Sequence, residues 1–352
     1  LIDFVALHAR VFSRDPRVTG SGAATSDVAR FPGTFAVFVP AWMESNVIGQ
    51  MLDAALESYA NEDIHLFVGV YPNDPATRKI VRARVGPRIS MVVVDRRGGT
   101  TKAHCLNNIY RAMVSQEAMG ERRYSGVILH DAEDVINRRE IDVFRRNAAR
   151  YAMVQLPVYP LQHPESRWIS GHYCDEFADA HSRAMIARQA LGAALPSAGV
   201  GCMFRRDLID AFAQRGCGMP FSEGSLTEDY EIGLRLRDLG FTSAFIVEAD
   251  DSKTGVVCTR AYFPHKLFPA IRQKARWMAG IGLEGWVRLG WGNSWPEVWM
   301  RARDRSGLIS TLLFLAAYLS LIAAILLWYL QRQSGATFSL PSGALSSLLH
   351  IT

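Results

Sequence analysis

The first half of the chain alternates short apolar runs with amphipathic stretches, and this alternation limits the fold more than any other feature. The apolar runs, each the length of a buried strand, cover 35–40, 64–70, 89–95 and 127–130. Segments with helical character lie between them at 44–59, 76–84 and 101–116. Strands separated by helices form a mostly parallel sheet covered by helices. The sequence therefore predicts an α/β fold for this half.

Polar residues follow each predicted strand at its carboxyl end, where ligands of such sheets bind. They are Glu44 after the first strand, Asn73 and Asp74 after the second, Lys102 after the third, and Asp131, Glu133 and Asp134 after the fourth. A single acid at a strand end is more often a turn or cap residue. Because four sets converge on one edge, we expect a binding site there.

The acidic residues after the fourth strand favour a metal ion. The carboxylates of Asp131, Glu133 and Asp134 repel one another unless a cation lies nearby. A divalent metal that holds a diphosphate would supply that charge. The alternative is a helix start, since Asn137 and Glu140 have capping-box spacing and acids favour that end of a helix. Asp131 and Glu133 precede this cap by several residues, which favours the metal.

The second half is less regular. We expect a strand at 153–159, a helix at 171–191 and a strand at 242–247. Gly201 and Cys202 end a run of small residues, which either lets the backbone approach a ligand closely or makes a tight strand turn.

Ser225 and Glu228 have the S-x-x-E spacing of a capping box, which predicts a helix that runs on to Gly240. Glu228 is then either a cap or a catalytic acid. Asp229 is not needed by the box, so it is the better candidate for acid–base chemistry.

The last part of the chain predicts contact with a membrane. From residue 264 the pattern is amphipathic, with Gln273, Arg276 and Trp277 on one helix face, and four tryptophans follow before residue 300. Gly307–Leu330 carries no charge over 24 residues, long enough for a transmembrane helix. Three arginines precede this run (Arg301, Arg303 and Arg305) and only Arg332 follows it. By the positive-inside rule, the preceding domain is cytoplasmic.

Composition narrows the partners. The net charge is +5, but basic and acidic residues are interleaved, which favours an anionic substrate and anionic lipid over nucleic acid. The five cysteines are odd in number and lack a C-x-x-C pair, which argues against a disulfide framework or a zinc site and fits a reducing compartment. No secretory signal peptide is visible in residues 1–17, and we expect further chain upstream, such as another membrane helix.

Several motifs occur together and in a fixed order. They are Glu44 after Pro40, Asn73-Asp74, Lys102 with Asn107, the acidic stretch from Asp131, Thr227-Glu228-Asp229, and Gln273-x-x-Arg276-Trp277. This set resembles the membrane-embedded glycosyltransferases of family 2, which include cellulose, chitin and hyaluronan synthases, over about residues 34–280. The stretches VPAWMESNVIGQML, YPNDPAT, HDAEDV and PSAGVGCMFRRD are similar to the bacterial inner-membrane NfrB-like glycosyltransferases, named as phage-adsorption proteins.

The resemblance implies a GT-A-type fold and a role for each motif. It implies that Asp74 contacts the uridine, Lys102 the nucleotide or diphosphate, and that Asp131 with Glu133 holds Mg²⁺ or Mn²⁺ on the diphosphate, with Glu44 near the nucleotide. Asp229 would be the catalytic base, with Glu228 beside it. Gln273 and Arg276 would hold the diphosphate, and Trp277 would stack on the acceptor sugar, near Gly201 and Cys202. Glu133 replaces the second aspartate of the family motif, so Asp134 is a rival metal ligand.

The implied activity is inverting transfer from a UDP-sugar to a growing polysaccharide. The subgroup hints at a UDP-N-acetylhexosamine, at processive synthesis of a surface exopolysaccharide that serves as a phage receptor, and at an outer-membrane export protein as partner. Family members are often controlled by a cyclic-di-GMP-binding domain, which lies outside this chain. The alternatives are a non-processive transferase that makes a lipid-linked sugar and a catalytically silent membrane receptor or scaffold.

These expectations divide the chain into five parts. They are an N-terminal juxtamembrane segment (1–30), a cytoplasmic GT-A domain (31–260), amphipathic interfacial helices (261–306), a transmembrane helix (307–330), and a polar linker or start of a next membrane segment (331–352) in the bacterial inner membrane.

Overall fold

Strand β1 lies inside a seven-stranded sheet, and its side chains point alternately into two cores. This computed structural model describes residues 31–120, 122–250 and 255–334, so the predicted segment 1–30 and most of 331–352 lie outside the described residues. The strands are β1 (Thr34–Ala41), β2 (Ile64–Val70), β3 (Ile89–Val93), β4 (Tyr124–Leu129), β5 (Met153–Gln155), β6 (Val158–Leu161), β7 (Cys202–Arg205), β8 (Ser243–Phe245) and β9 (Thr259–Tyr262).

The sheet is mostly parallel, as predicted. Its strand order is β3-β2-β1-β4-β7-β5-β8. The first four strands in that order run parallel, with Phe38 of β1 opposite Phe67 of β2 and Leu129 of β4. Strand β7 is antiparallel to both β4 and β5, and β8 is parallel to β5. The carboxyl ends of β1 to β4 therefore meet at one edge.

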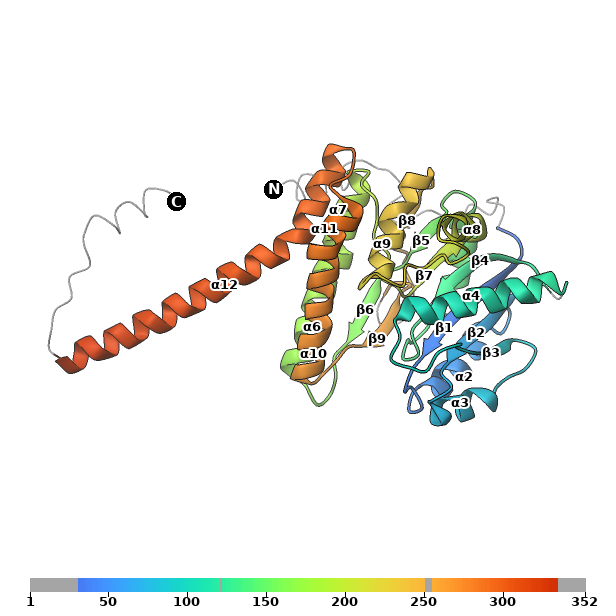
Figure 1. Ribbon diagram of the computed structural model, residues 1–352, viewed down its shortest axis with the longest axis horizontal. Helices are drawn as coiled ribbons and strands as arrows, with labels where there is room; N and C mark the ends of the chain where they lie inside the picture. Colours follow the sequence, from blue (N-terminus) through green and yellow to red (C-terminus); the bar gives the residue numbers. More distant parts are fainter. Residues whose placement is uncertain (1–30, 121, 251–254, 335–352) are drawn as a thin grey trace.

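Helices cover both faces of this sheet, because each central strand is apolar on both sides. Helices α2 (Ile48–Ser58) and α5 (Glu140–Ala148) pack on the face that holds Phe35, Val37 and Val39. Helices α4 (Lys102–Ala118) and α8 (Arg206–Arg215) pack on the face that holds Ala36 and Phe38, and Figure 1 shows α4 lying across this side. The remaining helices of the first half and the centre are α3 (Pro75–Arg82), α6 (Arg167–Asp179), α7 (Met185–Ala190) and α9 (Glu228–Arg235).

The prediction of one strand over 153–159 is wrong. The chain forms β5, leaves the sheet at Leu156 and Pro157, and then forms β6. Strand β6 pairs with β9 in a separate two-stranded parallel sheet. Proline has no backbone N–H for a ladder, so Pro157 suits the change of sheet.

The predicted helix at 171–191 is longer and not uniform. It begins at Arg167 as α6, passes through a π-helical turn, η1 (Ala180–Ala184), and ends as α7. A second π-helical segment, η3 (Met278–Glu284), joins α10 (Leu267–Trp277) to α11 (Gly285–Leu289). Figure 1 shows α6 and α10 side by side, next to β6 and β9.

Helix α12 (Trp295–Ser334) is continuous across the predicted boundary at residue 307 and extends away from the domain (Figure 1). Its first turns pack on the domain, since Glu297, Met300, Arg301 and Arg305 are buried. The apolar remainder is exposed, and α12 is the one helix among the described residues that is long and apolar enough to cross a membrane.

Candidate active site

Lys102 begins α4 and lies among the acidic residues at the carboxyl edge of the sheet. Its Nζ is 2.5 Å from Oδ1 of Asp131 and donates to the Gly199 carbonyl at 3.2 Å. Burial lowers the pKa of Lys102, but the charges of Asp131, Asp229 and Glu228 raise it by a larger amount, so the net shift of the pKa is upward. One ammonium group thus joins residues that lie up to 127 positions apart in the sequence, from Lys102 to Asp229.

Glu228 and Asp229 occupy the first turn of α9, whose N-terminal cap is Thr227. The predicted capping box is wrong, because Thr227 makes no side-chain cap and the Ser225 hydroxyl accepts instead from the Thr227 amide at 3.3 Å. Glu228 is therefore not required as a cap. Its buried side chain lies beside Asp229.

Both carboxyl groups of this turn have raised pKa values. Burial and the charge of Asp229 raise the pKa of Glu228, Lys102 and Arg276 oppose the shift, and the net pKa is about 7. Burial also raises the pKa of Asp229, against the lowering effects of Lys102, the Tyr230 amide and Arg276. Asp229 Oδ1 accepts from the Tyr230 amide at 2.7 Å. A carboxyl group with a raised pKa is suited to take up a proton near neutral pH.

The absence of a side chain at Gly199 leaves room for the Asp229 carboxylate. The backbone of Gly199 has φ +74°, and a Cβ there would lie 2.5 Å from Oδ2 of Asp229. Sequence reasoning noted this run of small residues but selected Gly201 and Cys202, which the structure does not place at an open surface. Cys202 is fully buried in β7, and both backbone polar groups of Gly201 are bonded within the protein. The run forms the turn that leads into β7, and the acceptor contact of these two residues stays a prediction.

Glu44 and Glu133 complete the acidic edge. Burial raises the pKa of Glu44, as do the charges of Asp131 and Asp74. The Glu133 side chain is exposed, but the surrounding chain still removes water from it and, together with Asp131, Glu44 and Asp134, raises its pKa to about 8. Three carboxylates, Glu44, Asp131 and Glu133, therefore crowd one another beside a single lysine.

Asp134 faces the interior, and its role as a rival metal ligand stays a prediction. Its Oδ2 accepts from the Asp131 amide at 3.0 Å and lies 2.9 Å from Nδ1 of the fully buried His130. On the other side of the ring, Nε2 lies 2.8 Å from Glu140. Burial lowers the pKa of His130, yet Glu140 and Asp134 raise it to about 10. In the described part of the chain, 131–134 does not bring three ligand atoms within 4.8 Å of one another.

The capping box proposed for Asn137 and Glu140 is also wrong. Helix α5 begins at Glu140 after Arg139, with no side-chain cap. Glu140 is fully buried, and its carboxylate accepts from the Tyr59 hydroxyl as well as contacting His130. This buried group holds the turn that presents Asp131.

Asp74 is itself a cap. Its Oδ1 accepts from the Thr77 amide at the start of α3, and its Oδ2 accepts from the Met43 amide at 2.7 Å. Burial raises the pKa of Asp74, but the bonds from Thr77 and Met43 outweigh it and the net shift is downward. Asp74 thus ties the loop that carries Glu44 to the end of β2, and its contact with a uridine stays a prediction.

The last predicted motif packs against the first turn of α9. Arg276 donates to the Leu226 carbonyl at 3.4 Å, and a Cβ at Gly280 would lie 2.6 Å from the Thr227 side chain. Gln273 has a buried Oε1 with no hydrogen-bond partner among the described residues. The structure therefore brings the Thr227-Glu228-Asp229 motif and the Gln273-x-x-Arg276-Trp277 motif together, through a bond between residues 50 positions apart.

Trp277 belongs to an aromatic cluster that joins α10 to α6. Its ring lies edge-on to Tyr173 and Phe177, with centroids 6.1 Å apart in both cases, and 6.4 Å from Phe263. Lys274 Nζ lies 5.0 Å from the centre of the Trp277 ring, and burial lowers the pKa of Lys274 to about 8.

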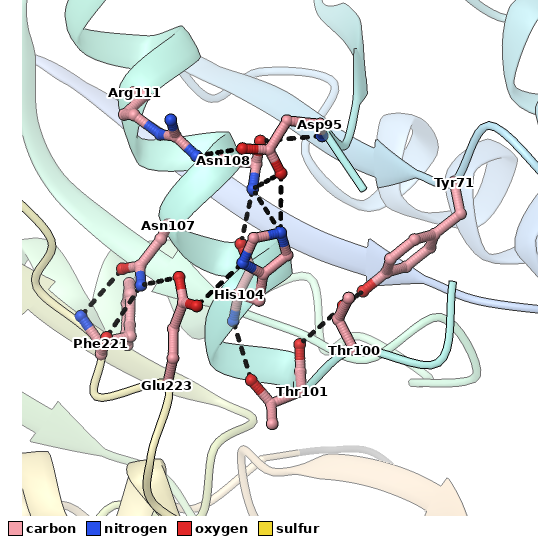
Figure 2. Close-up of polar contacts among 10 residues, drawn as sticks. All are labelled: Tyr71, Asp95, Thr100, Thr101, His104, Asn107, Asn108, Arg111, Phe221 and Glu223. Carbon is pink, nitrogen blue, oxygen red and sulfur yellow. Dashed lines mark hydrogen bonds and ion pairs between the residues drawn. The ribbon is translucent and has the colours of Figure 1, made fainter. Parts of the chain in front are cut away.

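A polar network on α4 was not predicted from the sequence, although Asn107, one of its members, belongs to the motif set. Figure 2 shows His104 between Asp95, at 2.7 Å, and Glu223, at 3.0 Å. Asn107 exchanges hydrogen bonds with the Phe221 backbone. The network ties the loop after β3 to the segment that leads into α9. The sequence indicates this network only by the polar residues at 104, 107 and 108, which lie on the buried side of α4 among apolar residues.

The arrangement combines a proton acceptor with groups that stabilise negative charge. Asp229 is a carboxylate in a largely buried turn, while Lys102 and Arg276 are cations beside it. Such a set can deprotonate a hydroxyl and stabilise an anionic leaving group.

Comparisons with known proteins agree with this geometry. The family model described as "Glycosyltransferase like family 2" matches residues 32–280. The chain belongs to glycosyltransferase family 2. The described part is thus a glycosyltransferase domain, and the family predicted from the motifs is confirmed.

Two relatives are closely similar to this chain. "Bacteriophage adsorption protein B" of Escherichia coli (strain K12) is 39% identical over 310 residues, which cover 83% of this chain and 42% of the relative. "Bacteriophage N4 adsorption protein B" of Escherichia coli O157:H7 has the same identity and coverage. The chain therefore spans less than half the length of these curated relatives.

Among solved structures, a mannosyltransferase from Pyrobaculum calidifontis in complex with GDP-Man and Mn²⁺ has a similar fold. It is 18% identical, with a TM-score of 0.63, over 99% of this chain and 87% of that one. The predicted GT-A-type fold is confirmed.

Proposed function

We propose that this family 2 glycosyltransferase domain transfers a sugar, with inversion, from a UDP-sugar to a growing polysaccharide. The observation that carries the proposal is the position of Lys102, which touches Asp131 and lies close to Asp229 and Glu228. One cation thereby links the residues proposed for the donor to the residue proposed as the base.

The transfer follows from the positions of these groups. Asp229 takes the proton from an acceptor hydroxyl while that oxygen bonds to the anomeric carbon of the donor. The bond from this carbon to the diphosphate breaks, and the electron pair leaves with UDP. Lys102 and Arg276 offset the charge that grows on the diphosphate.

The acidic edge suits a divalent metal ion. Burial together with the charges of Asp131, Glu44 and Asp134 raises the pKa of Glu133 to about 8, and a divalent cation would relieve the repulsion among these carboxylates. We propose Mg²⁺ or Mn²⁺, held by Asp131 and Glu133 together with phosphate oxygens, and the Mn²⁺ bound to the Pyrobaculum enzyme supports this choice. The ion would neutralise diphosphate charge.

Helix α10 is proposed to complete the site. Among the described residues, the buried Oε1 of Gln273 has no partner and would accept from a sugar hydroxyl, and the exposed guanidinium of Arg276 makes only a long bond to the Leu226 carbonyl and would donate to the diphosphate. Trp277 offers a flat apolar surface of the kind that stacks on a sugar ring, and its neighbours in the aromatic cluster fix the ring.

The membrane orientation is part of the proposal. Arg301 and Arg305 are buried and donate to backbone carbonyls. They therefore give less support to the positive-inside rule than their place in the sequence indicated. Lys266, which precedes α10, and Arg272 on α10 instead lie exposed near the exposed Phe268, a combination that binds an anionic leaflet. We place the domain on the cytoplasmic side of a bacterial inner membrane.

The relatives' role in phage adsorption supports a product at the cell surface. We propose an exopolysaccharide, made processively from a UDP-N-acetylhexosamine and exported through an outer-membrane protein. Control by a cyclic-di-GMP-binding domain would come from outside this chain.

A donor panel tests the proposal. Membranes that contain the protein are incubated with single UDP-sugars and Mg²⁺ or Mn²⁺, and free UDP and products are measured. Release of UDP with a high-molecular-weight product is expected. A solvent-extractable lipid product would show a lipid-linked transferase instead, and no UDP release from any donor would indicate a receptor or scaffold.

A further inference from the structure

Two histidines and a glutamate gather where the small sheet leads into α6 and α10. His163 and Glu165 lie in the loop before α6, and His265 lies in the loop before α10. The rings of His163 and His265 are stacked, with centroids 3.8 Å apart and planes 11° apart. The loop that carries His265 lies at the start of α10, and Leu267 is about 15 Å along the helix axis from Trp277, at 1.5 Å per residue. The proposed transfer reaction uses none of these three side chains.

We propose that this cluster binds one transition-metal ion of the Zn²⁺ class. Each of the three residues offers one ligand atom, and these atoms lie within 4.8 Å of one another. Ligand atoms on a tetrahedral Zn²⁺, with bonds of about 2.0–2.1 Å, are about 3.4 Å apart. To share an ion, the three atoms need to approach one another by no more than about 1.4 Å, and the two stacked rings need to tilt so that the lone pair of each points at the ion.

The fold holds the two loops together before any ion binds. Strands β6 and β9 are parallel neighbours, with Leu161 opposite Tyr262, so both chains leave the sheet at the same edge. The His163 amide donates to the Ser170 hydroxyl at 3.1 Å, and the His163 ring contacts the Tyr262 ring at 5.7 Å. These contacts limit the freedom that ion binding would otherwise have to remove.

The ligand chemistry separates this cluster from the acidic edge. Imidazole nitrogens favour Zn²⁺, Co²⁺, Ni²⁺ and Cu²⁺, whereas Mg²⁺ prefers oxygen ligands. His163 and His265 are partly buried, and the Glu165 carboxylate is 77% exposed, with Oε2 3.9 Å from Nε2 of His265. His163 Nδ1 accepts a long hydrogen bond, 3.2 Å, from the Glu165 amide, which an ion would replace. Three protein ligands leave a further position for water.

The cysteine pattern argued against a zinc site built from cysteines, but it carries no information about a site built from histidines and a glutamate. The ligands are two histidines and a glutamate. Glu165 and His265 are 100 positions apart in the sequence, but the pairing of β6 with β9 brings their loops together. A bound ion would cross-link the loops before α6 and α10. It would thereby fix the start of the helix that carries Gln273, Arg276 and Trp277.

Metal titration of the untagged, detergent-solubilised chain tests the site. After dialysis against a chelator, the protein is titrated with Co²⁺ by visible absorption and with Zn²⁺ by calorimetry, with excess Mg²⁺ present to occupy oxygen sites. One equivalent is expected to bind. His163→Ala and His265→Ala should each weaken binding by about tenfold or more. His172→Ala, an exposed histidine on α6, is the matched control and should bind as the wild type does.

Each variant is first checked for folding by its thermal melt and for UDP binding. If an alanine variant fails this check, His163→Gln or His265→Gln takes its place. Absence of a bound equivalent in the wild type would overturn the proposal. Equal affinity in the wild type and in both cluster variants would overturn it as well, and so would displacement of Co²⁺ by Mg²⁺.

Discussion

Lys102 is the cation around which the acidic residues of the site are arranged. It contacts Asp131 directly, and its charge partly offsets the rise that burial causes in the pKa of Asp229. We expect Lys102→Met to lower kcat by about a hundredfold, because removal of one preorganised group at a developing charge has an effect of this size. UDP release measures it.

The matched control is Lys79→Met, on the exposed surface of α3. It should retain the activity of the wild type. Wild-type turnover in Lys102→Met, with a normal thermal melt in both variants, would contradict the arrangement described here.

Glu228 and Asp229 should set the acid limb of the pH profile. A carboxyl group acts as a base only when deprotonated, and burial raises the pKa of both Glu228 and Asp229 above the ordinary carboxyl range. Activity should therefore fall as the pH decreases through these raised pKa values. In Glu228→Gln one negative charge is lost, so the pKa of Asp229 decreases and the acid limb of kcat/KM moves to lower pH.

The exposed acid Asp238 provides a control for this shift. Asp238→Asn should leave the acid limb in place. An acid limb that stays unchanged in Glu228→Gln would show that the two carboxyl groups do not titrate together.

Single residues were predicted well where a motif fixed their role and less well where burial decided it. Lys102, Asp131 and Asp229 meet as expected. Asp134 turns toward His130 and Cys202 lies within β7, so both are more buried than the motifs indicated. The direction in which a side chain points depends on packing that a one-dimensional pattern does not contain.

At the scale of elements, the turn before β7 positions the proposed base. Gly199→Ala should lower turnover by about a hundredfold, because its Cβ would lie 2.5 Å from Oδ2 of Asp229 and displace the carboxylate. The substitution also has a backbone cost of about 1–2 kcal/mol, since φ is +74°. UDP release and the free energy of unfolding are measured together.

Gly192→Ala separates these two effects. Gly192 has φ +71° and nothing within 4 Å of an added Cβ, so this variant should lose similar stability but keep its activity. If both variants lose activity equally, the contact with Asp229 is not the cause.

The strands and helices of the first half were predicted to within a few residues, because each strand is apolar on both faces and each helix is amphipathic. The errors follow from features without such a period. The chain changes sheets at Pro157, and the starts of α5 and α9 carry buried acids that resemble caps in sequence. A capping box and a buried ionic group use the same residue types, so spacing alone does not separate them.

For the whole molecule, α12 is expected to carry the chain across a membrane. Leu319 and Ile322 are exposed on the same face of its apolar part. The double variant Leu319→Arg/Ile322→Arg should disfavour insertion by about 5–7 kcal/mol, from about 2.5–3.5 kcal/mol for each arginine. A topology reporter fused after Thr352 measures the outcome, and the alanine double variant is its control.

The reporter should lie across the membrane from the catalytic domain in the wild type and in the alanine variant, and on the same side in the arginine variant. A wild-type reporter on the same side as the domain would contradict a single crossing by α12. The sequence predicted this span from its lack of charge, but it did not reveal that the first turns of the same helix pack on the domain through Glu297 and Arg301.

The central claim is that Asp229 is the base of a glycosyl transfer carried out at this edge of the sheet. Its most direct test compares Asp229→Asn with the wild type in one preparation, by UDP release from the active donor and by UDP affinity. The account predicts that turnover is abolished while the affinity for UDP changes little. Turnover close to that of the wild type in Asp229→Asn would contradict it.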